Sequence, residues 1–239
     1  MKMSRKPVIG ITKPESKRMN LSFMIHWVAL WLAGGRPKIT SYDEDVKNQH
    51  YDALMLGGGT DVFPGLFFKD PKENYAYDHK RDDLEIRLLK KAHDEGLPVI
   101  AICRGSQLMN VVNGGTVHMD ISTVYEKANY PRNILGYLFF RKKIIIEPGS
   151  MLHEIAGDTE LMVNSIHSQS IDKVGEGLVV TSCEPNGIIQ SVEKPRHIFY
   201  MGVQFHPERL IYKSVFRRLF KTFIDAAKTK MEEKGAMNS

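Results

Sequence analysis

Apolar residues along this chain fall into short segments, and their spacing predicts alternating strands and helices through its first half. The segment KPVIGIT at 6–12 is typical of a strand, because β-branched residues pack well on a pleated sheet. The apolar run at 20–33, ended by Gly34 and Gly35, predicts a helix. A short strand at 38–41 and the segment ALMLGGG, a strand that stops at three glycines, follow it.

A second set of segments repeats this order. Residues 82–95 carry apolar side chains at helical spacing, with two aspartates that favour the helix start and Gly96 at its end. LPVIAIC is a continuous apolar segment, typical of a central parallel strand covered on both faces, and SQLMNVVNGG predicts the next helix. This order of strands and helices predicts a parallel sheet with helices on both sides.

The second half has shorter apolar segments joined by turn residues. We expect KKIIIEPGS, LMVNS, GLVVTSCE, GIIQSVE and FYMGVQF to be strands that extend the sheet in antiparallel fashion. YKSVFRRLFKTFIDAAKTKMEEKG predicts one long final helix. No repeat or linker-like segment interrupts the pattern, so we expect a single domain over residues 1–239 with a mostly parallel central α/β sheet and added antiparallel strands.

Composition favours a cytoplasmic protein. The chain has two cysteines, Cys103 and Cys183, which argues against a disulfide framework. Its start, MKMSRKPVIGIT, has too few apolar residues for a signal peptide, and LSFMIHWVALWLAGG falls short of the ~20 residues of a membrane span. We expect that segment to form a buried amphipathic helix. Trp27 and Trp31 share a face of it, where core packing is expected and a substrate entrance or dimer contact is the alternative.

The net charge of +5 changes this picture little. Nucleic-acid binding favours basic residues that cluster and interleave with stacking aromatic residues. Here acidic residues are mixed with the basic ones at 141–143 and near Arg217, Arg218 and Lys221. We therefore interpret these residues as solvated surface and expect no nucleic-acid partner, while attraction to anionic substrates stays open.

The segment VIAICRGSQLMN at 99–110 places Cys103 between a predicted strand and a predicted helix. The partial positive charge at a helix N-terminus stabilises a thiolate, and Gly105 permits a sharp turn. This order is typical of a nucleophile elbow, whose side chain projects from the carboxyl edge of the sheet and whose next backbone N–H faces a developing oxyanion. Ala101 stands where such elbows usually have their first glycine. A buried core cysteine is the alternative interpretation.

A base for such a thiol occurs in MGVQFHPE at 201–208. His206 follows an apolar strand, Pro207 stiffens the turn, and Glu208 is two residues further on. A carboxylate there can hold one imidazole nitrogen so that the other faces the sulfur. Alone, His-Pro-Glu is typical of a loop, and the pairing with a cysteine at a strand end is what favours catalysis.

Glycines end another predicted strand in LGGGTDVFP at 56–64. They let backbone N–H groups turn toward a ligand. A phosphate cradle is the rival interpretation, but the segment matches neither GxxxxGK[ST] nor GxGxxG. A plain glycine turn is the third. The remaining histidines are scattered without HExxH or CxxC spacing, so we expect no metal.

Taken together, the segments GGGTDVFP, AHDEGLPVIAICRGSQLMNVVNGGTV, VNSIHSQSIDKVG and GVQFHPE resemble the class I glutamine amidotransferase-like superfamily. Within it the chain resembles the γ-glutamyl hydrolase branch, peptidase family C26, and is most similar to its γ-glutamyl-GABA hydrolase type. The likeness covers nearly the whole chain. It implies a flavodoxin-like three-layer sandwich and a cysteine hydrolase that forms a γ-glutamyl thioester, releases glutamate and needs no cofactor.

The resemblance also implies which residues form the site. The catalytic triad would be Cys103, His206 and Glu208. The oxyanion hole would use backbone N–H groups of Arg104 and of Gly58 or Gly59. The residues that match positions lining the γ-glutamyl site are Gln107, Asn164, Ser165 and His167. For His167, a satisfied polar residue at a strand end is the alternative interpretation.

Several residues depart from the family pattern. Leu108 stands where CRGxQE has its glutamate, Ser168 where HHQAI has its second histidine, and Gln190 where DGxIE has its glutamate. None belongs to the triad, so they bear on the leaving group. Relatives carry a similar charged pair where Arg81 and Asp82 stand, for which we expect a structural role at a helix start before a role in the site.

Two other functions share these motifs. A glutaminase subunit would pass ammonia to a synthetase on a separate chain, although the CRG-type elbow argues against it. A non-catalytic binding protein of the same fold is disfavoured by the complete triad. The expected partner is a small γ-glutamyl substrate, with a homodimer as a further possibility and a synthetase partner only under the first alternative.

Overall fold

The computed structural model describes residues 5–13, 21–40, 42, 45–128, 130, 139–165 and 167–237. Its strands are β1 (Val8–Thr12), β2 (Arg36–Thr40), β3 (Ala53–Leu56), β4 (Val99–Ile102), β5 (Val117–His118), β6 (Lys142–Ile146), β7 (Glu160–Val163), β8 (Ser170–Ile171), β9 (Val179–Cys183), β10 (Ile189–Glu193) and β11 (Tyr200–Val203). Its α-helices are α1 (Leu21–Leu32), α2 (His79–Glu95), α3 (Arg104–Val112), α5 (Met151–Ala156) and α6 (Ser214–Met237). Short 3-10 helices are η1 (Val46–Asn48), η2 (Pro64–Phe67), η3 (Ile121–Thr123) and η4 (Pro207–Leu210).

The main sheet keeps its parallel and antiparallel strands in two separate parts. Among the described residues, nine strands pair in the order β2-β1-β3-β4-β11-β10-β9-β6-β7. The strands from β2 to β11 in this order are parallel, and those from β11 to β7 pair antiparallel. β5 and β8 form a small antiparallel ladder. The predicted fold class, a central sheet between helices with added antiparallel strands, is confirmed.

One strand differs from the sequence-based expectation. The pattern predicts FYMGVQF as an antiparallel addition, but β11 runs parallel to β4, with Val203 opposite Ile102. The prediction is wrong because β10 is the reversed strand. β11 is antiparallel to β10 and so returns to the direction of β4. As a result β4 and β11 end at the same edge of the sheet, and the residues that follow them meet there.

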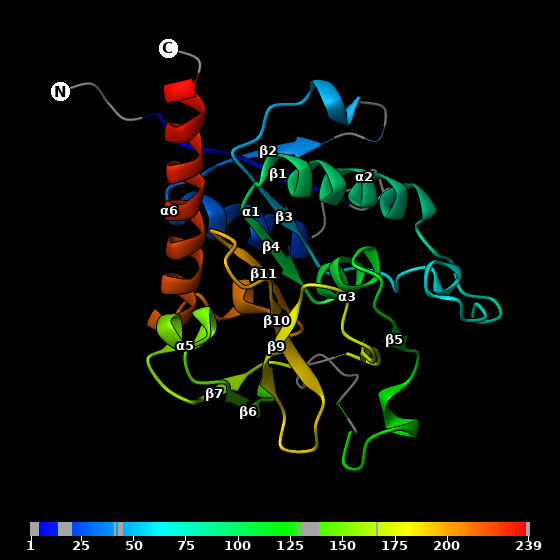
Figure 1. The fold of residues 1–239 in the computed structure, drawn as a ribbon. Coiled ribbons are helices and arrows are strands. Elements are labelled where there is room, and N and C mark those ends of the chain that lie inside the picture. The colour runs from blue at the N-terminus through cyan, green and yellow to red at the C-terminus, as the bar shows by residue number, and fades with distance from the viewer. Residues whose placement is uncertain are drawn as a thin grey trace.

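Helices cover both faces of the sheet (Figure 1). α1, α5 and α6 pack on one face, and α2 and α3 pack on the other. Alternate residues of β4 face these two layers: Ile100 and Ile102 face the first, Val99 and Ala101 the second. All four are completely buried, so β4 is the central strand that its continuous apolar sequence predicts.

α2 begins earlier than the aspartates at 82 and 83 predict. Asp78 caps the helix by accepting a hydrogen bond from the backbone N–H of Arg81. The helix ends before Gly96, as expected, and Gly96 has the left-handed φ of 61° that favours glycine. The earlier start carries Arg81 and Asp82 inside the first turns, where both side chains are buried.

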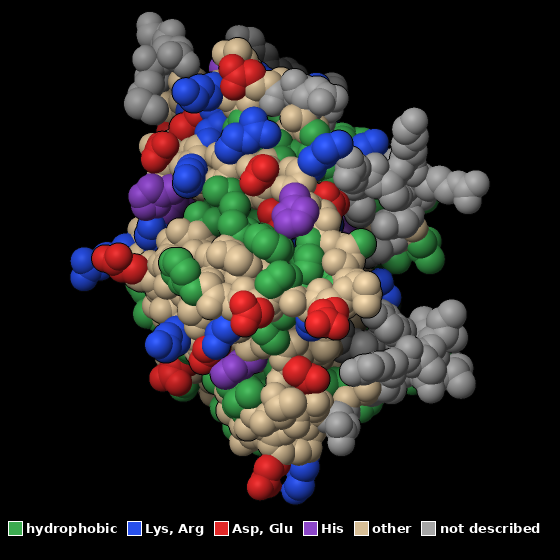
Figure 2. Space-filling view, turned by 90° about the vertical axis from the view of Figure 1, so that its right-hand side faces the viewer, with side chains coloured by type: hydrophobic (Ala, Val, Ile, Leu, Met, Phe, Trp, Pro, Cys, Tyr) green, Lys and Arg blue, Asp and Glu red, His purple; other side chains and the backbone are tan. Residues whose placement is uncertain are grey.

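α1 is buried on one side only. Trp27 packs against the core, whereas Trp31 exposes 57 % of its surface. Core packing is therefore the wrong expectation for Trp31. No helix of the described residues is long and apolar enough to cross a membrane. On the face that Figure 2 shows, Lys and Arg side chains lie among Asp and Glu side chains, as the mixed charges of the sequence predict.

Candidate active site

Cys103 lies at a tight turn between β4 and α3. Its backbone, at φ 53° and ψ −110°, occupies a region that residues other than glycine rarely adopt. Two contacts hold it there. The Cys103 N–H donates to the carbonyl oxygen of Val203 at 2.7 Å. Gly105 lies so close to β3 that a Cβ there would be 2.7 Å from the Leu56 carbonyl oxygen. The chain thus has a strand–turn–helix at this point, with α3 beginning at Arg104.

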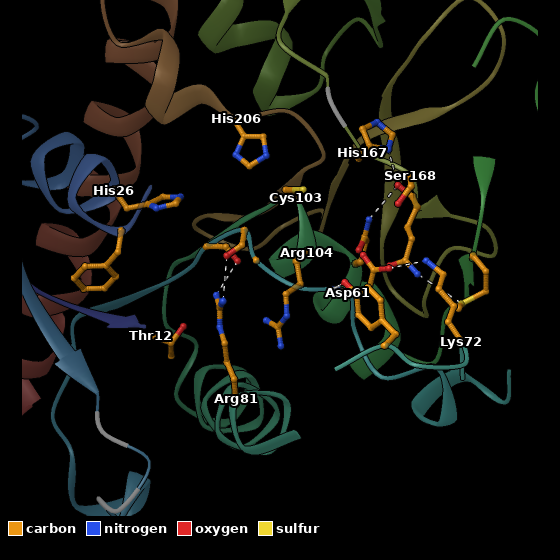
Figure 3. A pocket seen from close by; sticks show the side chains of 18 of the residues that line it. Thr12, His26, Asp61, Lys72, Arg81, Cys103, Arg104, His167, Ser168 and His206 are labelled. Carbon is orange, nitrogen blue, oxygen red and sulfur yellow. Dashed lines mark hydrogen bonds and ion pairs between the residues drawn. The ribbon is translucent and has the colours of Figure 1, made fainter. Parts of the chain in front are cut away.

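His206 and Glu208 follow β11 at the same edge of the sheet. His206 Nδ1 lies 2.8 Å from Glu208 Oε1, and the backbone N–H of His206 donates to the Asn164 side chain at 3.1 Å. Both His206 and Glu208 are buried. In Figure 3 the His206 ring lies above Cys103. Because the Glu208 carboxylate accepts from Nδ1, the Nε2 atom is the one left for the Cys103 sulfur.

These three residues perturb one another electrostatically. Burial by itself would lower the pKa of His206, but the Glu208 carboxylate and then the Cys103 sulfur outweigh burial and raise that pKa. Burial would likewise raise the pKa of Glu208, but His206 and then His26 outweigh it and lower that pKa. Glu208 is therefore ionised, and His206 favours its protonated form.

α1 brings a second histidine to Glu208. His26 Nε2 lies 3.5 Å from Glu208 Oε1, and both side chains are buried. Figure 3 shows the His26 ring reaching toward the space between Cys103 and Arg81. The sequence does not distinguish His26 from the other scattered histidines. The signal that could have found it is its position in a helix without a charged residue.

The glycine turn after β3 lies between Cys103 and α2. Arg81 donates hydrogen bonds to the carbonyl oxygens of Gly57 at 3.0 Å and Gly58 at 3.1 Å. In a trans peptide the next N–H points opposite to the carbonyl, so the N–H groups of Gly58 and Gly59 point away from Arg81. Figure 3 shows Arg81 below these hydrogen bonds and Cys103 above them. The turn therefore presents N–H groups on the side of the sulfur.

Space as well as direction requires glycine at this turn. A Cβ at Gly58 would lie 2.9 Å from His206 Cε1 and 3.7 Å from Cys103 Cβ. A Cβ at Gly59 would overlap the Arg81 guanidinium. Any larger residue would push either the imidazole or the arginine out of place.

Four buried charged side chains lie under the glycine turn and form what we call the charged network: Arg81, Asp82, Glu85 and Arg104. Arg104 pairs with both Asp82 and Glu85, and Arg81 Nε donates to Glu85 Oε1 at 2.8 Å. Thr12 donates to Glu85 as well. Two positive charges balance two negative ones, which is the condition for burying charges at tolerable cost.

The charged network affects its two carboxylates differently. Burial would raise the pKa of Glu85, but Arg104 and Arg81 outweigh burial and lower it. For Asp82 burial is the stronger effect and raises the pKa, although Arg104 opposes it. Glu85 is therefore the firmly ionised centre that both arginines share.

A second set of polar residues, which we call the amide network, runs from buried Glu184, Gln190 and Ser165 to His167, which is partly exposed and lines the pocket. Glu184 Oε1 accepts from Gln190 Nε2 at 2.7 Å, and the same amide donates to Ser165 Oγ at 2.8 Å. Ser165 Oγ lies 2.8 Å from His167 Nε2, and His167 Nδ1 lies 2.5 Å from the Gln169 carbonyl oxygen. The network therefore runs from Glu184 to the backbone of the pocket wall.

The partners of His167 determine its tautomer. A carbonyl oxygen can only accept, so the proton must be on His167 Nδ1, and Nε2 then accepts from the Ser165 hydroxyl. Burial, opposed by the Gln169 hydrogen bond, lowers the pKa of His167 to about 4. His167 is therefore neutral near pH 7, and the one charge of the network is Glu184, paired with Lys142 at 3.3 Å.

These elements surround a pocket of about 550 Å³. On either side of Cys103 it is lined by Thr12 and His26 at one end, and by Asp61, Lys72 and Ser168 at the other (Figure 3). Lys72 Nζ lies 2.8 Å from Asp61 Oδ2, so this second end carries both signs of charge. A cleft with a nucleophile at its centre and polar groups at its ends suits a small, extended, polar ligand.

The structure gathers most predicted site residues at this pocket. Those that line it are Gly58, Gly59, Cys103, Arg104, Gln107, His167 and His206. Glu208 stands behind His206. Asn164 and Ser165 are not among the lining residues: Asn164 holds the backbone of His206, and Ser165 holds the ring of His167.

Three buried residues of the site are not singled out by sequence reasoning. Gln204 donates to Cys103 Sγ at 3.5 Å and accepts from Gln107 at 3.1 Å. Glu85 lies one turn after Arg81, and a charged pair at that spacing on an otherwise apolar helix face was the available signal. Glu184 is six residues from Gln190, but its pairing with Lys142 joins residues that are far apart in the sequence, so no local pattern indicated it.

The chain has the class I glutamine amidotransferase fold. A solved structure from Thermoplasma acidophilum, provisionally named as a component of GMP synthase, matches with a TM-score of 0.69. The match covers 97 % of this chain and 98 % of that one, at 18 % sequence identity. At this identity the likeness shows the fold alone.

The chain belongs to the peptidase C26 family, whose model matches residues 7–208. A Mycobacterium tuberculosis protein provisionally named as a glutamine amidotransferase, Rv2859c, is 36 % identical over 178 residues, which are 73 % of this chain and 55 % of that protein. The γ-glutamyl-γ-aminobutyrate hydrolase of Escherichia coli O157:H7 is 30 % identical over 190 residues, 77 % of this chain and 74 % of the relative. The family resemblance is thus confirmed, and the chain is a hydrolase- or amidotransferase-like enzyme.

Proposed function

We propose that this protein hydrolyses γ-glutamyl amide bonds, with Cys103 as nucleophile, His206 as general acid and base, and Glu208 as the group that orients His206. The observation that carries this proposal is the convergence, at one sheet edge, of a strained cysteine elbow and a buried His–Glu pair at 2.8 Å. The relative named as a γ-glutamyl-γ-aminobutyrate hydrolase supports the substrate class.

The first half of the reaction transfers the γ-glutamyl group to sulfur. The Cys103 thiolate attacks the γ-carbonyl carbon, and the carbonyl π electrons move onto the oxygen. The N–H groups of Gly58 or Gly59 and of Arg104 donate to this oxyanion, each worth ~3 kcal/mol when well placed. The intermediate then expels the amine, which takes its proton from His206, and a γ-glutamyl thioester stays on Cys103.

The second half releases glutamate. Neutral His206 takes a proton from water, and the resulting hydroxide attacks the thioester carbonyl through the same oxyanion hole. Cys103 leaves as a thiolate beside protonated His206. Glu208 stabilises that protonated ring in both halves, which agrees with the raised pKa of His206.

The γ-glutamyl head lies, in this proposal, at the end of the pocket with Gln107 and the segment that starts at His167. Its α-ammonium and α-carboxylate have opposite charges, and the Asp61–Lys72 pair supplies a partner for each. Asn164 and Ser165 act from behind the wall by holding His206 and His167. The leaving amine occupies the other end, near Thr12 and His26.

The decisive experiment measures glutamate release by the purified protein offered glutamine and a panel of γ-glutamyl amines and peptides. We expect fast release from at least one γ-glutamyl amine and a mass increase of one γ-glutamyl group on the enzyme when turnover is stopped with acid. Cys103→Ala should abolish both signals. Cys183→Ala is the matched control, since Cys183 is the other cysteine and lies in β9, and it should keep both.

The relative provisionally named as a glutamine amidotransferase favours a second candidate, a glutaminase that delivers ammonia to a separate synthetase. The same panel separates the two. Hydrolysis of glutamine alone, slow in the isolated protein, would favour the glutaminase. Undiminished hydrolysis by Cys103→Ala would contradict both candidates.

A further inference from the structure

We propose that the outer face of α1 is the contact by which two copies of this chain form a dimer. α1 contains no Asp, Glu, Lys or Arg over its 12 residues, LSFMIHWVALWL. Its inner face packs on the core through Phe23, Ala29 and Leu30. A helix that is apolar on all sides is normally buried on all sides.

The outer face of α1 is nevertheless open. Its exposed apolar residues and exposed fractions are Leu21 (74 %), Met24 (47 %), Val28 (42 %), Trp31 (57 %) and Leu32 (61 %). The other long helices differ, because α2 and α6 carry charged side chains such as Arg87 and Lys221 on their exposed positions. This contrast with α2 and α6 indicates that the outer face of α1 is normally covered by a partner rather than exposed to solvent.

The spacing of these residues identifies the kind of partner. Leu21, Met24, Val28 and Trp31 follow one another at intervals of three, four and three residues, which is the seam of a helix that packs against a second helix. A second copy presents the same seam, and two such helices related by a two-fold axis are self-complementary. Dimer interfaces of this kind are also the most apolar ones.

The exposed area is sufficient for such a pair. Taking ~200 Å² for a fully exposed large apolar residue, the five residues expose roughly 550 Å² per copy. A symmetric pair would then bury about 1,100 Å², above the ~1,000 Å² that a specific interface needs. The interface therefore requires no large contribution from other surfaces.

A dimer through α1 would adjoin the candidate active site. Phe23 and His26 on the inner face line the pocket, and His26 Nε2 lies 3.5 Å from Glu208 Oε1. Packing of the outer face would hold α1, and with it His26, against Glu208. The dimer itself does not depend on the proposed chemistry, because its seam residues lie outside the pocket.

The chain is well suited to a direct test, since its only two tryptophans, Trp27 and Trp31, are both in α1. Sedimentation velocity from about 1 to about 100 µM should show a monomer–dimer equilibrium or a stable dimer. In a Trp27→Phe variant, the emission of Trp31 should shift to the red as the dimer dissociates on dilution. Monomer at every concentration, with solvent-exposed Trp31 emission throughout, would overturn the proposal.

The specific variant is Met24→Glu, which places a charge in the seam and should weaken dimerisation by at least about a hundredfold. Met162→Glu is the matched control, because Met162 is exposed to a similar degree, 44 %, but lies on β7. It should leave dimerisation within about threefold. Trp31→Gln is the second variant if Met24→Glu fails to fold. Equal dimerisation by either seam variant and the control would refute the α1 contact.

Discussion

The charged network and the amide network both hold the backbone of the pocket in place, but they do so by different interactions. The charged network holds the glycine turn with two arginines and two carboxylates, all buried and mutually neutralised. The amide network holds the backbone near His167 with one carboxylate, and its other links are neutral hydrogen bonds. Both hold backbone groups of the pocket in place, but one depends on charge balance and the other on the position of a proton.

Because their interactions differ, the two networks should be destabilised by different changes. Removing one charge from a balanced buried cluster leaves its partner without compensation, and the cost is large. Removing one member of a neutral hydrogen-bond chain leaves an unsatisfied polar atom, and the cost is smaller. The charged network should therefore be the more sensitive to mutation, whereas the amide network should also be weakened by protonation of His167.

The largest effect is expected for Glu85→Gln, which keeps the shape of the side chain and removes the charge that both arginines share. We expect a loss of roughly 3–5 kcal/mol in the free energy of unfolding, measured by urea denaturation. Arg87→Ala, an exposed position on the same helix, should stay within about 0.5 kcal/mol. A change below about 1 kcal/mol for Glu85→Gln would show that the cluster is not balanced as described.

Gly58→Ala tests the turn that the charged network supports. The added Cβ would meet His206 Cε1 at 2.9 Å and displace the imidazole. We expect kcat to fall by about a hundredfold or more while the protein stays folded. Gly235→Ala is the control, because a Cβ there meets nothing within 4 Å, and it should leave kcat unchanged. Equal kcat for the two variants would remove Gly58 from the site.

A charge exchange tests the amide network. Gln190→Glu places a second carboxylate beside buried Glu184 and should cost roughly 1–3 kcal/mol of stability. The double variant Glu184→Gln with Gln190→Glu restores a single carboxylate, at the position where the family pattern has glutamate. We expect it to recover most of the loss in a double-mutant cycle. Additive losses would mean that the two residues do not interact.

The fourth expected effect, similar in size to the third, is a pH dependence. The pKa of His167 is about 4 in the folded protein, against about 6.5 for an unfolded histidine. Between these values the unfolded chain binds more protons, so this contribution is complete above about pH 6.5 and is lost as the pH falls toward 4. Its size is roughly 1–3 kcal/mol.

Glu85 of the charged network should respond at lower pH than His167. The pKa of Glu85 is lowered by folding, so its contribution is complete above about 4.5 and is lost only as the pH falls through the folded value. Urea denaturation as a function of pH, in the native chain and in His167→Asn, separates the two windows. A difference curve without slope between about pH 6.5 and 4 would contradict the neutral state of His167.

The strands, turns and helices next to the candidate catalytic residues could be predicted from the sequence. The continuous apolar segment before Cys103 and the glycine after it predicted the strand, the turn and the helix, because backbone preference and burial act over a few residues. His206 and Glu208 are two residues apart, so their pairing was also within reach of local reasoning. The resemblance to the C26 family rested on the same short segments.

Tertiary structure alone decided which distant residues meet. The direction of β11 depends on its partners β4 and β10, and the residues of the segment FYMGVQF do not indicate which strands these are. Glu85 reaches Arg104 only because α2 and α3 pack on the same face of the sheet. Glu184 meets Lys142 because β9 and β6, which are distant in the sequence, pair as neighbouring strands. The exposure of Trp31 is decided in the same way. Hydrophobic periodicity predicts that a helix has an apolar face, but which element covers that face depends on how the helices and strands pack together.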